Sequence, residues 1–355
     1  MAVFLRRSIN AVTALFAVQF AGGVAVIVNE KLRAKKVSRI LDHAGAALLV
    51  TDDRLLGATP GLAFDDARIL SLDAVDLPAR GIDPEPAIGT DLALILYTPG
   101  PKGLMLSHAN VLEAARTVSD YLHLSSRDTL ISLLPFSFDY GLNQLTTSLL
   151  VGARLVIQRS MLPAAICKTL RYEKVTGMAG VPLLWTQLSQ SYSPFLQKRF
   201  PHLRFLTNTG GRFPPEFLRR FRESHRRTDL HHMYSPAEAF RSTYLPPEQL
   251  EKRPDSVGKA GPNVEVLIVD ADGRICGPGE EGELVHRGAH VPLGYWRDQE
   301  ATERVLRPHP VFGEREMVIY SGDIVKADEE GYLYLVRRKE QIRTARTDKS
   351  GSFPI

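Results

Sequence analysis

The sequence has few cysteines and no large excess of charge of either sign, and both shortages narrow the possible functions. Only Cys167 and Cys276 occur in 355 residues, and neither has a cysteine or histidine neighbour at metal-ligand spacing. A cysteine-ligated metal is therefore not expected, and the low count suits a reducing, cytoplasmic environment. Lys and Arg number 44 against 40 Asp and Glu. Composition alone thus does not indicate a nucleic-acid partner.

Long apolar runs are scarce, and internal repeats and low-complexity tracts are not evident. One uncharged segment, residues 11–28, follows two arginines and has the outline of a signal peptide or a marginal membrane helix. Thr13, Gln19 and the glycines at 22 and 23 divide it. We therefore predict a helix of about a dozen residues followed by a β-branched strand, and no membrane span.

One dense basic run occurs, "RRFRESHRR" at 219–227. Its spacing predicts the wet face of an amphipathic helix that begins near Pro215 and buries Phe217, Leu218 and Phe221. A phosphate-binding patch is the alternative interpretation.

Short apolar segments alternate with helical ones through much of the chain. Such alternation predicts a parallel sheet covered on both faces, with ligands at the carboxyl ends of its strands. The expected helices are 32–44 and 110–122. The expected strands are 23–28, 46–51, 92–98, 153–158 and 203–211.

The pattern changes after about Pro262, where Asp-Gly and Glu-Gly turns join short alternating strands. This predicts antiparallel hairpins or a small barrel. We therefore predict an α/β core at 1–261, a small β-rich subdomain at 262–335, and an irregular tail at 336–355.

Five motifs together resemble one family. They are "YTPGPKGLMLSH", "NTGG", "YSPAEAFRSTYLPP", "YSGDIVKADEEGYLYLV" and "RRKEQIR", in that order. Their order and spacing are similar to those of the adenylate-forming, AMP-producing acid ligases, most closely the acyl-CoA ligases of the type associated with exosortase A systems. The resemblance implies a large N-terminal α/β domain with parallel sheets and a small β-barrel-like subdomain. It also implies that the family's opening β-α portion and its C-terminal domain are lacking.

The resemblance implies a reaction as well. The carboxylate of an acid, expected to be a fatty acid, attacks the α-phosphate of ATP with the help of Mg²⁺, and the acyl group is then transferred to CoA. The first motif corresponds to the family's phosphate loop, Tyr-Thr-Ser-Gly-Ser-Thr-Gly-x-Pro-Lys-Gly. Thr98, Gly100, Lys102 and Gly103 match it, Pro99 replaces a serine, and the Ser-Thr-Gly-x portion is lacking. By resemblance, Lys102 would be catalytic. The shortened loop offers fewer hydrogen-bond donors to the phosphates of ATP. The alternative interpretation is that this segment is only a turn between a strand and a helix.

The other motifs supply the remaining nucleotide residues by resemblance. The expected adenine contacts are Gly210, Gly211 and Tyr234, and Asp323 would hold the ribose hydroxyls. Glu238 would ligate Mg²⁺ and act in catalysis. There are structural alternatives: the glycines and Asp323 could simply form tight turns, and Glu238 could be a solvated surface residue.

The fifth motif keeps Arg337 and Ile342 of the family hinge, and by resemblance Arg337 would contact the nucleotide. Val336 and Lys339 replace the glycine and aspartate of the hinge. We expect the hinge function to be lost and the segment to be a charged strand end.

The acyl group would be bound near "LPFSFDYGLNQL" and "GMAGVPLLWTQL". Phe138, Tyr140, Val181 and Trp185 could line an apolar tunnel, with Leu142 and Leu184, although residues at these spacings are also ordinary core. Asp139 follows a phenylalanine, as in relatives that adenylate amino acids, where the carboxylate receives the substrate ammonium.

Three hypotheses therefore follow from the sequence: an impaired fatty acyl-CoA ligase, an amino-acid-type adenylating domain, or a non-catalytic nucleotide- or acyl-binding protein. Acid chain length and oligomeric state are left open.

Overall fold

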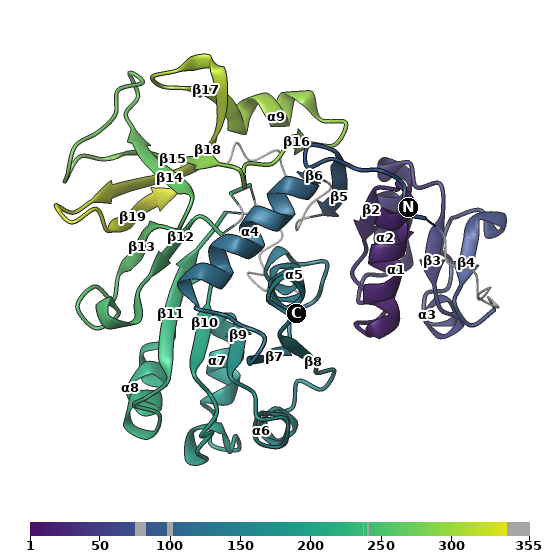
Figure 1. Cartoon of the computed structure of the whole chain (residues 1–355), viewed down its shortest axis with the longest axis horizontal. Coiled ribbons are helices and arrows are strands. Elements are labelled where there is room, and N and C mark those ends of the chain that lie inside the picture. Colours follow the sequence, from purple (N-terminus) through teal and green to yellow (C-terminus); the bar gives the residue numbers. More distant parts are fainter. Residues whose placement is uncertain (75–82, 98–101, 237, 240, 339–355) are drawn as a thin grey trace. The chain divides into compact units, whose positions relative to one another are not determined.

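The computed structural model describes residues 1–74, 83–97, 102–236, 238–239 and 241–338. These residues form two compact units, which we describe separately (Figure 1). The first unit comprises Met1–Val111, Pro135–Leu142 and Pro292–Thr302, and the second comprises Leu112–Leu134, Asn143–Val291 and the chain from Glu303. The predicted phosphate-loop residues Thr98 and Gly100, and the hinge positions Lys339 and Ile342, lie outside the described residues.

The first unit is built on a mixed sheet of order β16-β6-β5-β2-β1-β3-β4. Strands β5, β2, β1, β3 and β4 run parallel, whereas β6 and β16 are antiparallel to their neighbours. The strands are β1 Ala2–Val3, β2 Ala25–Ile27, β3 Leu49–Thr51, β4 Ile69–Ser71, β5 Leu92–Tyr97, β6 Gly103–Ser107 and β16 Gly294–Tyr295. The helices are α1 Ile9–Phe20, α2 Ala34–Ala44 and α3 Asp53–Gly57, with a short 3-10 turn at Asp66–Arg68.

Local chemistry explains how the uncharged segment 11–28 folds. Ser8 caps α1, because its hydroxyl accepts a hydrogen bond from the Ala11 N–H at 3.2 Å. The helix ends just before Gly22, whose φ of +67° lies in the left-handed region. Strand β2 follows. The predicted helix and strand are thus confirmed, and no helix among the described residues is long and apolar enough to cross a membrane.

The second unit contains a sheet whose first half is parallel, in the order β8-β7-β9-β10-β11. This confirms the predicted parallel strands of an α/β fold, and the predicted boundary at 261/262 stays a prediction. These strands are β7 Thr129–Ser132, β8 Arg154–Ile157, β9 Gly177–Gly180, β10 Phe205–Asn208 and β11 Asp229–Tyr234. The helices whose bounds fall in or extend into this unit are α4 His108–Tyr121, α5 Asp139–Val151, α6 Pro163–Tyr172, α7 Pro182–Leu188, α8 Pro215–Ser224 and α9 Gln299–Val305, with 3-10 turns at Phe195–Gln197 and Pro247–Gln249.

The same sheet continues with antiparallel strands in the order β12-β13-β19-β18-β15-β14, and β17 pairs with β18. The predicted antiparallel hairpins are therefore confirmed. Gly331, with φ +81°, makes the turn between β18 and β19. These strands are β12 Thr243–Leu245, β13 Ser256–Ala260, β14 Val264–Val269, β15 Gly282–Gly288, β17 Leu306–His309, β18 Gly313–Ala327 and β19 Leu333–Arg338.

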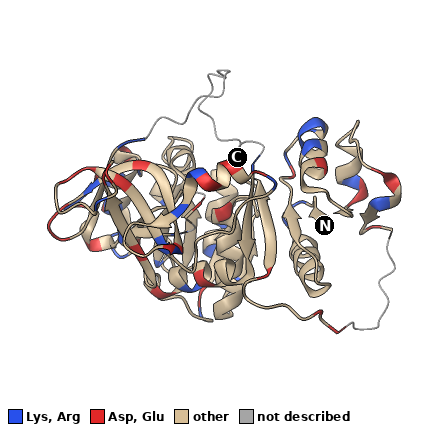
Figure 2. Cartoon of the chain, turned by 90° about the horizontal axis from the view of Figure 1, so that it is seen from above, with Lys and Arg blue, Asp and Glu red and all other residues tan. Residues whose placement is uncertain are grey.

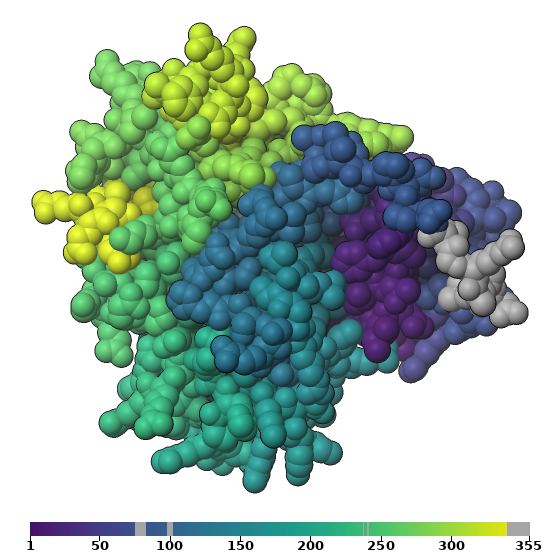
Figure 3. All heavy atoms as spheres, in the orientation of Figure 1, coloured from purple at the N-terminus to yellow at the C-terminus, as the bar shows by residue number. Residues whose placement is uncertain are grey.

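Helices cover the parallel strands of the second unit on both faces. Residues of α6, α7 and α8 pack with Leu206 of β10 and Leu230 of β11 in one hydrophobic core. On the other face, Tyr121 at the end of α4 lies against His231 of β11, with ring centroids 6.3 Å apart. In the space-filling view, segments of this unit that are far apart in the sequence, from teal to yellow, form one continuous surface (Figure 3).

The basic run at 219–227 begins inside α8, as predicted. Phe217 and Phe221 are fully buried, and Leu218 is partly buried against the same core. Arg219 instead pairs on the exposed face with Glu216 at 2.8 Å and with Glu223 at 3.0 Å. Figure 2 shows that Lys and Arg are interspersed with Asp and Glu over the described elements of each unit.

We predict that Gly258→Ala destabilises the second unit by about 2 kcal/mol or more. Gly258 has φ +87°, and an added Cβ would lie 2.0 Å from the Tyr244 carbonyl oxygen, which belongs to the neighbouring strand and cannot move freely. Urea unfolding of the wild type and the variant measures the change. Gly273→Ala is the control, because its φ of +82° is similar but no atom approaches the added Cβ within 4 Å. Equal destabilisation of both variants would show that φ alone matters.

Candidate functional site

The site in the second unit begins where β10 and β11 end, which is the edge predicted for ligands. Asn208, the last residue of β10, is fully buried and organises the "NTGG" turn. Its Nδ2 donates to the Gly211 carbonyl oxygen at 2.6 Å, and its Oδ1 accepts from Trp185 Nε1 at 2.8 Å. A buried amide with satisfied partners fixes the turn rigidly.

The two glycines of this turn present bare backbone. Gly210 has φ +77° and Gly211 has φ +144°, so both occupy conformations that favour glycine. No atom lies within 4 Å of the position of a Cβ on Gly210, and both residues are exposed. A flat ring can therefore approach the backbone here, and the adenine contact itself stays a prediction.

Tyr234, the last residue of β11, is joined to Asp323 of β18. The Tyr234 hydroxyl donates a hydrogen bond to Asp323 Oδ2. Burial, together with the nearby Asp323 carboxylate, raises the pKa of the Tyr234 hydroxyl well above its ordinary value. The structure thus unites two residues, 89 positions apart in the sequence, that the motifs had assigned to adenine and ribose.

The turn that presents Asp323 explains the sequence "YSGD". Ser321 Oγ donates to the Leu284 carbonyl oxygen at 2.8 Å and accepts from the Asp323 N–H at 3.1 Å. Gly322 adopts φ +74° and donates its N–H to Glu283 Oε1 at 3.1 Å. The carboxylate of Asp323 is therefore held in place by β15 as well as by its own strand.

Sequence reasoning missed Arg338. Its Nε lies 3.3 Å from Asp323 Oδ1, and the two residues are paired across β18 and β19. Arg337, which the hinge motif had selected, instead forms an ion pair with Glu281 at 2.9 Å. Neighbouring residues of a strand point to opposite faces, so only one of the two arginines can reach Asp323. Arg338 is therefore the arginine that contacts Asp323, and the nucleotide role of Arg337 stays a prediction.

Glu238 follows β11 by four residues and is half-buried. One carboxylate is compatible with Mg²⁺, which commonly takes one or two protein carboxylates and completes its shell with phosphate oxygens and water. Its metal role stays a prediction.

A buried histidine lies behind the pair of Tyr234 and Asp323. The His286 ring is stacked beside that of Tyr234, with centroids 6.4 Å apart, and the side chain is fully buried. Within the described chain, neither of its ring nitrogens has a hydrogen-bond partner. Burial lowers the pKa of His286 to about 3, so the folded protein holds this imidazole neutral.

This histidine predicts a pH dependence of stability. The unfolded chain protonates the imidazole below about pH 6.5, whereas the folded chain does not until about pH 3, so acid favours unfolding. We expect the free energy of unfolding of the wild type to fall by about 1.4 kcal/mol more per pH unit than that of His286→Leu, below about pH 6. Urea unfolding at a series of pH values measures both slopes. Equal slopes would contradict the assignment.

The remaining predicted nucleotide residues that the structure describes, Lys102 and Gly103, lie in the first unit. Lys102 places its ammonium over the Tyr295 ring, 5.0 Å from the centroid. A Cβ on Gly103 would lie 2.7 Å from Ile95 Cγ2, so this glycine is needed for close strand packing whatever the loop binds. Tyr97 bonds His43 Nδ1 at 2.7 Å, and burial raises the pKa of its hydroxyl to about 12.

The predicted acyl-pocket residues are divided between the units. Phe138 and Tyr140 in the first unit meet edge-on with ring centroids 6.3 Å apart, and Asp139 between them is half-buried in the first turn of α5. In the second unit, Val181 is half-buried just before α7. Trp185 has no exposed surface and packs in the core. A role for Trp185 in acyl contact stays a prediction; its visible contact supports the "NTGG" turn through Asn208.

The chain belongs to the AMP-binding enzyme family, whose model matches residues 1–296. This result confirms the family-level prediction that the motifs made. The relatives are adenylate-forming ligases of several kinds, so membership does not determine which acid this chain would use.

Two relatives show this range. Over 355 residues the chain is 26% identical to gramicidin S synthase 2 of Aneurinibacillus migulanus, covering 97% of this chain and 8% of that protein. It is 27% identical over 350 residues to 2-succinylbenzoate–CoA ligase of Geobacillus kaustophilus (strain HTA426), covering 96% of this chain and 68% of that protein. The chain therefore spans only a small part of the peptide synthetase.

Solved structures share the fold. VinN matches with a TM-score of 0.80 at 27% identity, covering 95% of this chain and 85% of that one. The N-terminal domain of FACL13 from Mycobacterium tuberculosis matches with a TM-score of 0.84 at 23% identity, covering 95% and 85%. The predicted fold, an adenylate-forming ligase N-terminal domain, is thereby confirmed.

Proposed function

We propose that the chain binds an adenine nucleotide through Gly210, Gly211, Tyr234 and Asp323 and activates a carboxylic acid as its acyl adenylate. The observation that carries the proposal is the hydrogen bond between Tyr234 and Asp323, next to strand β10, which ends in the "NTGG" turn with its two exposed glycines. The glycines offer a surface for a flat base, and the carboxylate offers acceptors for two ribose hydroxyls. Family membership supports the same use of these residues.

The chemical step requires positive charge near the α-phosphate, because negative charge develops there when the carboxylate attacks. Lys102 is our candidate for a fixed positive charge, and Glu238 is our candidate for holding Mg²⁺ against the phosphates. Both assignments come from motif order. ATP and Mg²⁺ are used by relatives of this family.

We further propose that the acid is a fatty acid and that the acyl group passes to CoA. The motifs most closely resemble acyl-CoA ligases, and one similar protein is a CoA ligase. The altered phosphate loop, with Pro99 and without the Ser-Thr-Gly-x portion, predicts weak activity at best, and nucleotide binding without catalysis is the corresponding alternative.

An amino acid is the second candidate substrate, and Asp139 is the observation that favours it. This carboxylate directly follows Phe138 and lies half-buried in the first turn of α5. Similar proteins include a peptide synthetase, and VinN has been solved in complex with L-aspartate. A carboxylate in the acid pocket would select a substrate ammonium.

An acid panel separates these candidates. The full chain is incubated with ATP, Mg²⁺, hydroxylamine and either fatty acids or amino acids, and hydroxamate and pyrophosphate are measured. We expect pyrophosphate only with fatty acids, about two orders of magnitude more slowly than with an unaltered relative. Asp139→Asn should leave this activity unchanged. Hydroxamate formed only from amino acids, and lost in Asp139→Asn, would establish the second candidate, and nucleotide binding without any pyrophosphate would overturn both.

A further inference from the structure

A buried histidine, His232 of β11, contacts the residue that organises the "NTGG" turn. His232 and Asn208 are register partners on the neighbouring parallel strands β11 and β10. The Asn208 Nδ2 atom lies 3.1 Å from His232 Nδ1. His232 is only 5% exposed, and Asn208 has no exposed surface. His232 lies outside the five sequence motifs, so none of them assigns it a role.

The other partners of Asn208 determine which way its amide points. An indole N–H can only donate, so the atom that faces Trp185 Nε1 at 2.8 Å is the amide oxygen. A carbonyl can only accept, so the atom that faces the Gly211 oxygen at 2.6 Å is the amide nitrogen. This nitrogen has a second N–H, and His232 Nδ1 is its partner. His232 Nδ1 is therefore an acceptor.

The protonation state of His232 agrees with an acceptor at Nδ1. Burial, with the positive charge of Arg212, lowers the pKa of His232 to about 4. The imidazole is therefore neutral near pH 7, and the bond from Asn208 selects the tautomer with its proton on Nε2. The imidazole also lies beside the Phe213 ring, with centroids 6.4 Å apart, and Phe213 follows the turn by two residues.

We propose that His232 is a positioning residue for the "NTGG" turn, and its use for a nucleotide rests on the proposed function. By accepting from Asn208, His232 prevents the amide from rotating, and the amide holds the backbone at Gly211. The two glycines of the turn then keep one conformation before a base arrives, which lowers the entropic cost of binding. His232 acts through Asn208 and does not have to touch the nucleotide.

A hydrogen bond that only stabilises the fold is the alternative. Removing the His232 acceptor would leave an N–H of Asn208 buried and unpaired, which is unfavourable in either case. The two interpretations differ in what happens to the turn. If His232 positions it, the loss should reach the Asn208 partners and the ligand as well as the free energy of unfolding.

NMR tests the positioning without a ligand. Nitrogen shifts of the imidazole near pH 7 should show an unprotonated Nδ1 on His232. In His232→Phe, which keeps a ring but removes the acceptor, the Trp185 indole N–H should exchange with solvent roughly tenfold faster, because Asn208 is no longer held. His232→Asn places an acceptor near the Nδ1 position and should restore slow exchange. A protonated Nδ1, or equal exchange rates in the wild type and His232→Phe, would overturn the proposal.

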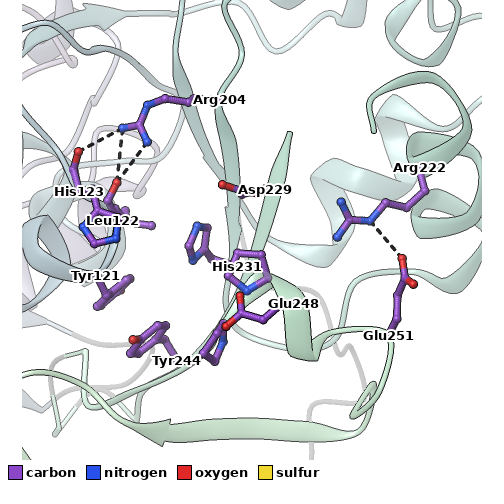
Figure 4. Close-up of a pocket in the computed structure, with 12 residues that line it drawn as sticks. Tyr121, Leu122, His123, Arg204, Arg222, Asp229, His231, Tyr244, Glu248 and Glu251 are labelled. Carbon is purple, nitrogen blue, oxygen red and sulfur yellow. Dashed lines mark hydrogen bonds and ion pairs between the residues drawn. The ribbon is translucent and has the colours of Figure 1, made fainter. Parts of the chain in front are cut away.

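Calorimetry of the full chain with AMP tests the consequence for binding. We expect His232→Phe to weaken AMP binding by roughly tenfold, and His232→Asn to bind AMP as the wild type does. The matched control is His231→Phe, which should leave AMP affinity unchanged. His231 precedes His232 on β11, so its side chain points to the opposite face of the sheet. It lines a cavity of about 530 Å³ that includes none of the proposed nucleotide residues (Figure 4).

A double-mutant cycle shows whether His232 acts through Asn208. Asn208→Ala alone should weaken AMP binding by roughly tenfold or more, because the turn loses its amide. In that background His232→Phe should cost little further affinity, since the bond that it removes is already absent. Losses that add in full would contradict the proposal. Urea unfolding of every variant separates a loss of binding from a loss of folding.

The results distinguish this proposal from the proposed function. If the wild type does not bind AMP, the proposed function and the use of the turn for a base both fail, whereas the Trp185 exchange rates still decide whether His232 positions the turn. If the wild type binds AMP, and His232→Phe binds it as tightly as His231→Phe does, the proposed function stands and the role of His232 is overturned.

Discussion

Asp323→Ala is expected to weaken AMP binding by about two orders of magnitude, because two hydrogen bonds from ribose hydroxyls to a charged carboxylate are lost. Asp323 is only 5% exposed and is held by the Ser321–Gly322 turn, so its oxygens are already oriented before a ligand arrives. Calorimetric titration of the full chain with AMP measures the change.

Tyr234→Phe is the control for this experiment. It removes the hydroxyl that donates to Asp323 but keeps the ring that is proposed to stack on adenine. We expect a much smaller loss of AMP affinity than for Asp323→Ala. Unfolding measurements on both variants correct for any change in stability. A folded Asp323→Ala chain that binds AMP as tightly as the wild type would remove the ribose assignment, and with it the main support for the proposed function.

The fold could be predicted well because it depends on repeated local signals. The segment 11–28 shows this: Ser8 and Gly22 fix where α1 begins and ends, so an apolar run that also suits a membrane helix becomes a short helix and a strand. In α8, the spacing of Phe217 and Phe221 determines the buried face before any tertiary contact is known. Such signals lie within a few residues of one another.

Residues of the candidate site could be predicted only where they belong to a recognisable sequence motif. Tyr234 and Asp323 were found through motif order, although nothing local in the sequence joins residues so far apart. Arg338 was missed because its contact depends on the register of β19 against β18, which places Arg338 and not Arg337 opposite Asp323. A shift of one residue would exchange the two arginines, and the sequence of either strand does not determine that register.

Trp185 illustrates a second limit. Its spacing suits an apolar acyl tunnel as well as an ordinary core, and nothing in the sequence shows that its N–H donates to Asn208 inside the core. Its acyl contact stays a prediction.

Restoring the phosphate loop is expected to raise ATP affinity by about two orders of magnitude while leaving AMP affinity unchanged. The variant carries Pro99→Ser and a Ser-Thr-Gly-x insertion between Gly100 and Pro101. Proline has no backbone N–H, and the lacking portion of the loop would bring further N–H groups and two hydroxyls to a multiply charged triphosphate. AMP has no β- or γ-phosphate, so it serves as an internal control for the rest of the site.

Calorimetry with ATP and with AMP, both with Mg²⁺ present, gives the two affinities for the wild type and the restored chain. An insertion of the same length without hydroxyl groups separates the contribution of backbone N–H donors from that of the Ser and Thr side chains. We expect this second variant to recover part of the gain in ATP affinity. If the unaltered chain already binds ATP about tenfold more tightly than AMP, "YTPGPKG" still holds the phosphates, and our interpretation of the shortened loop is wrong.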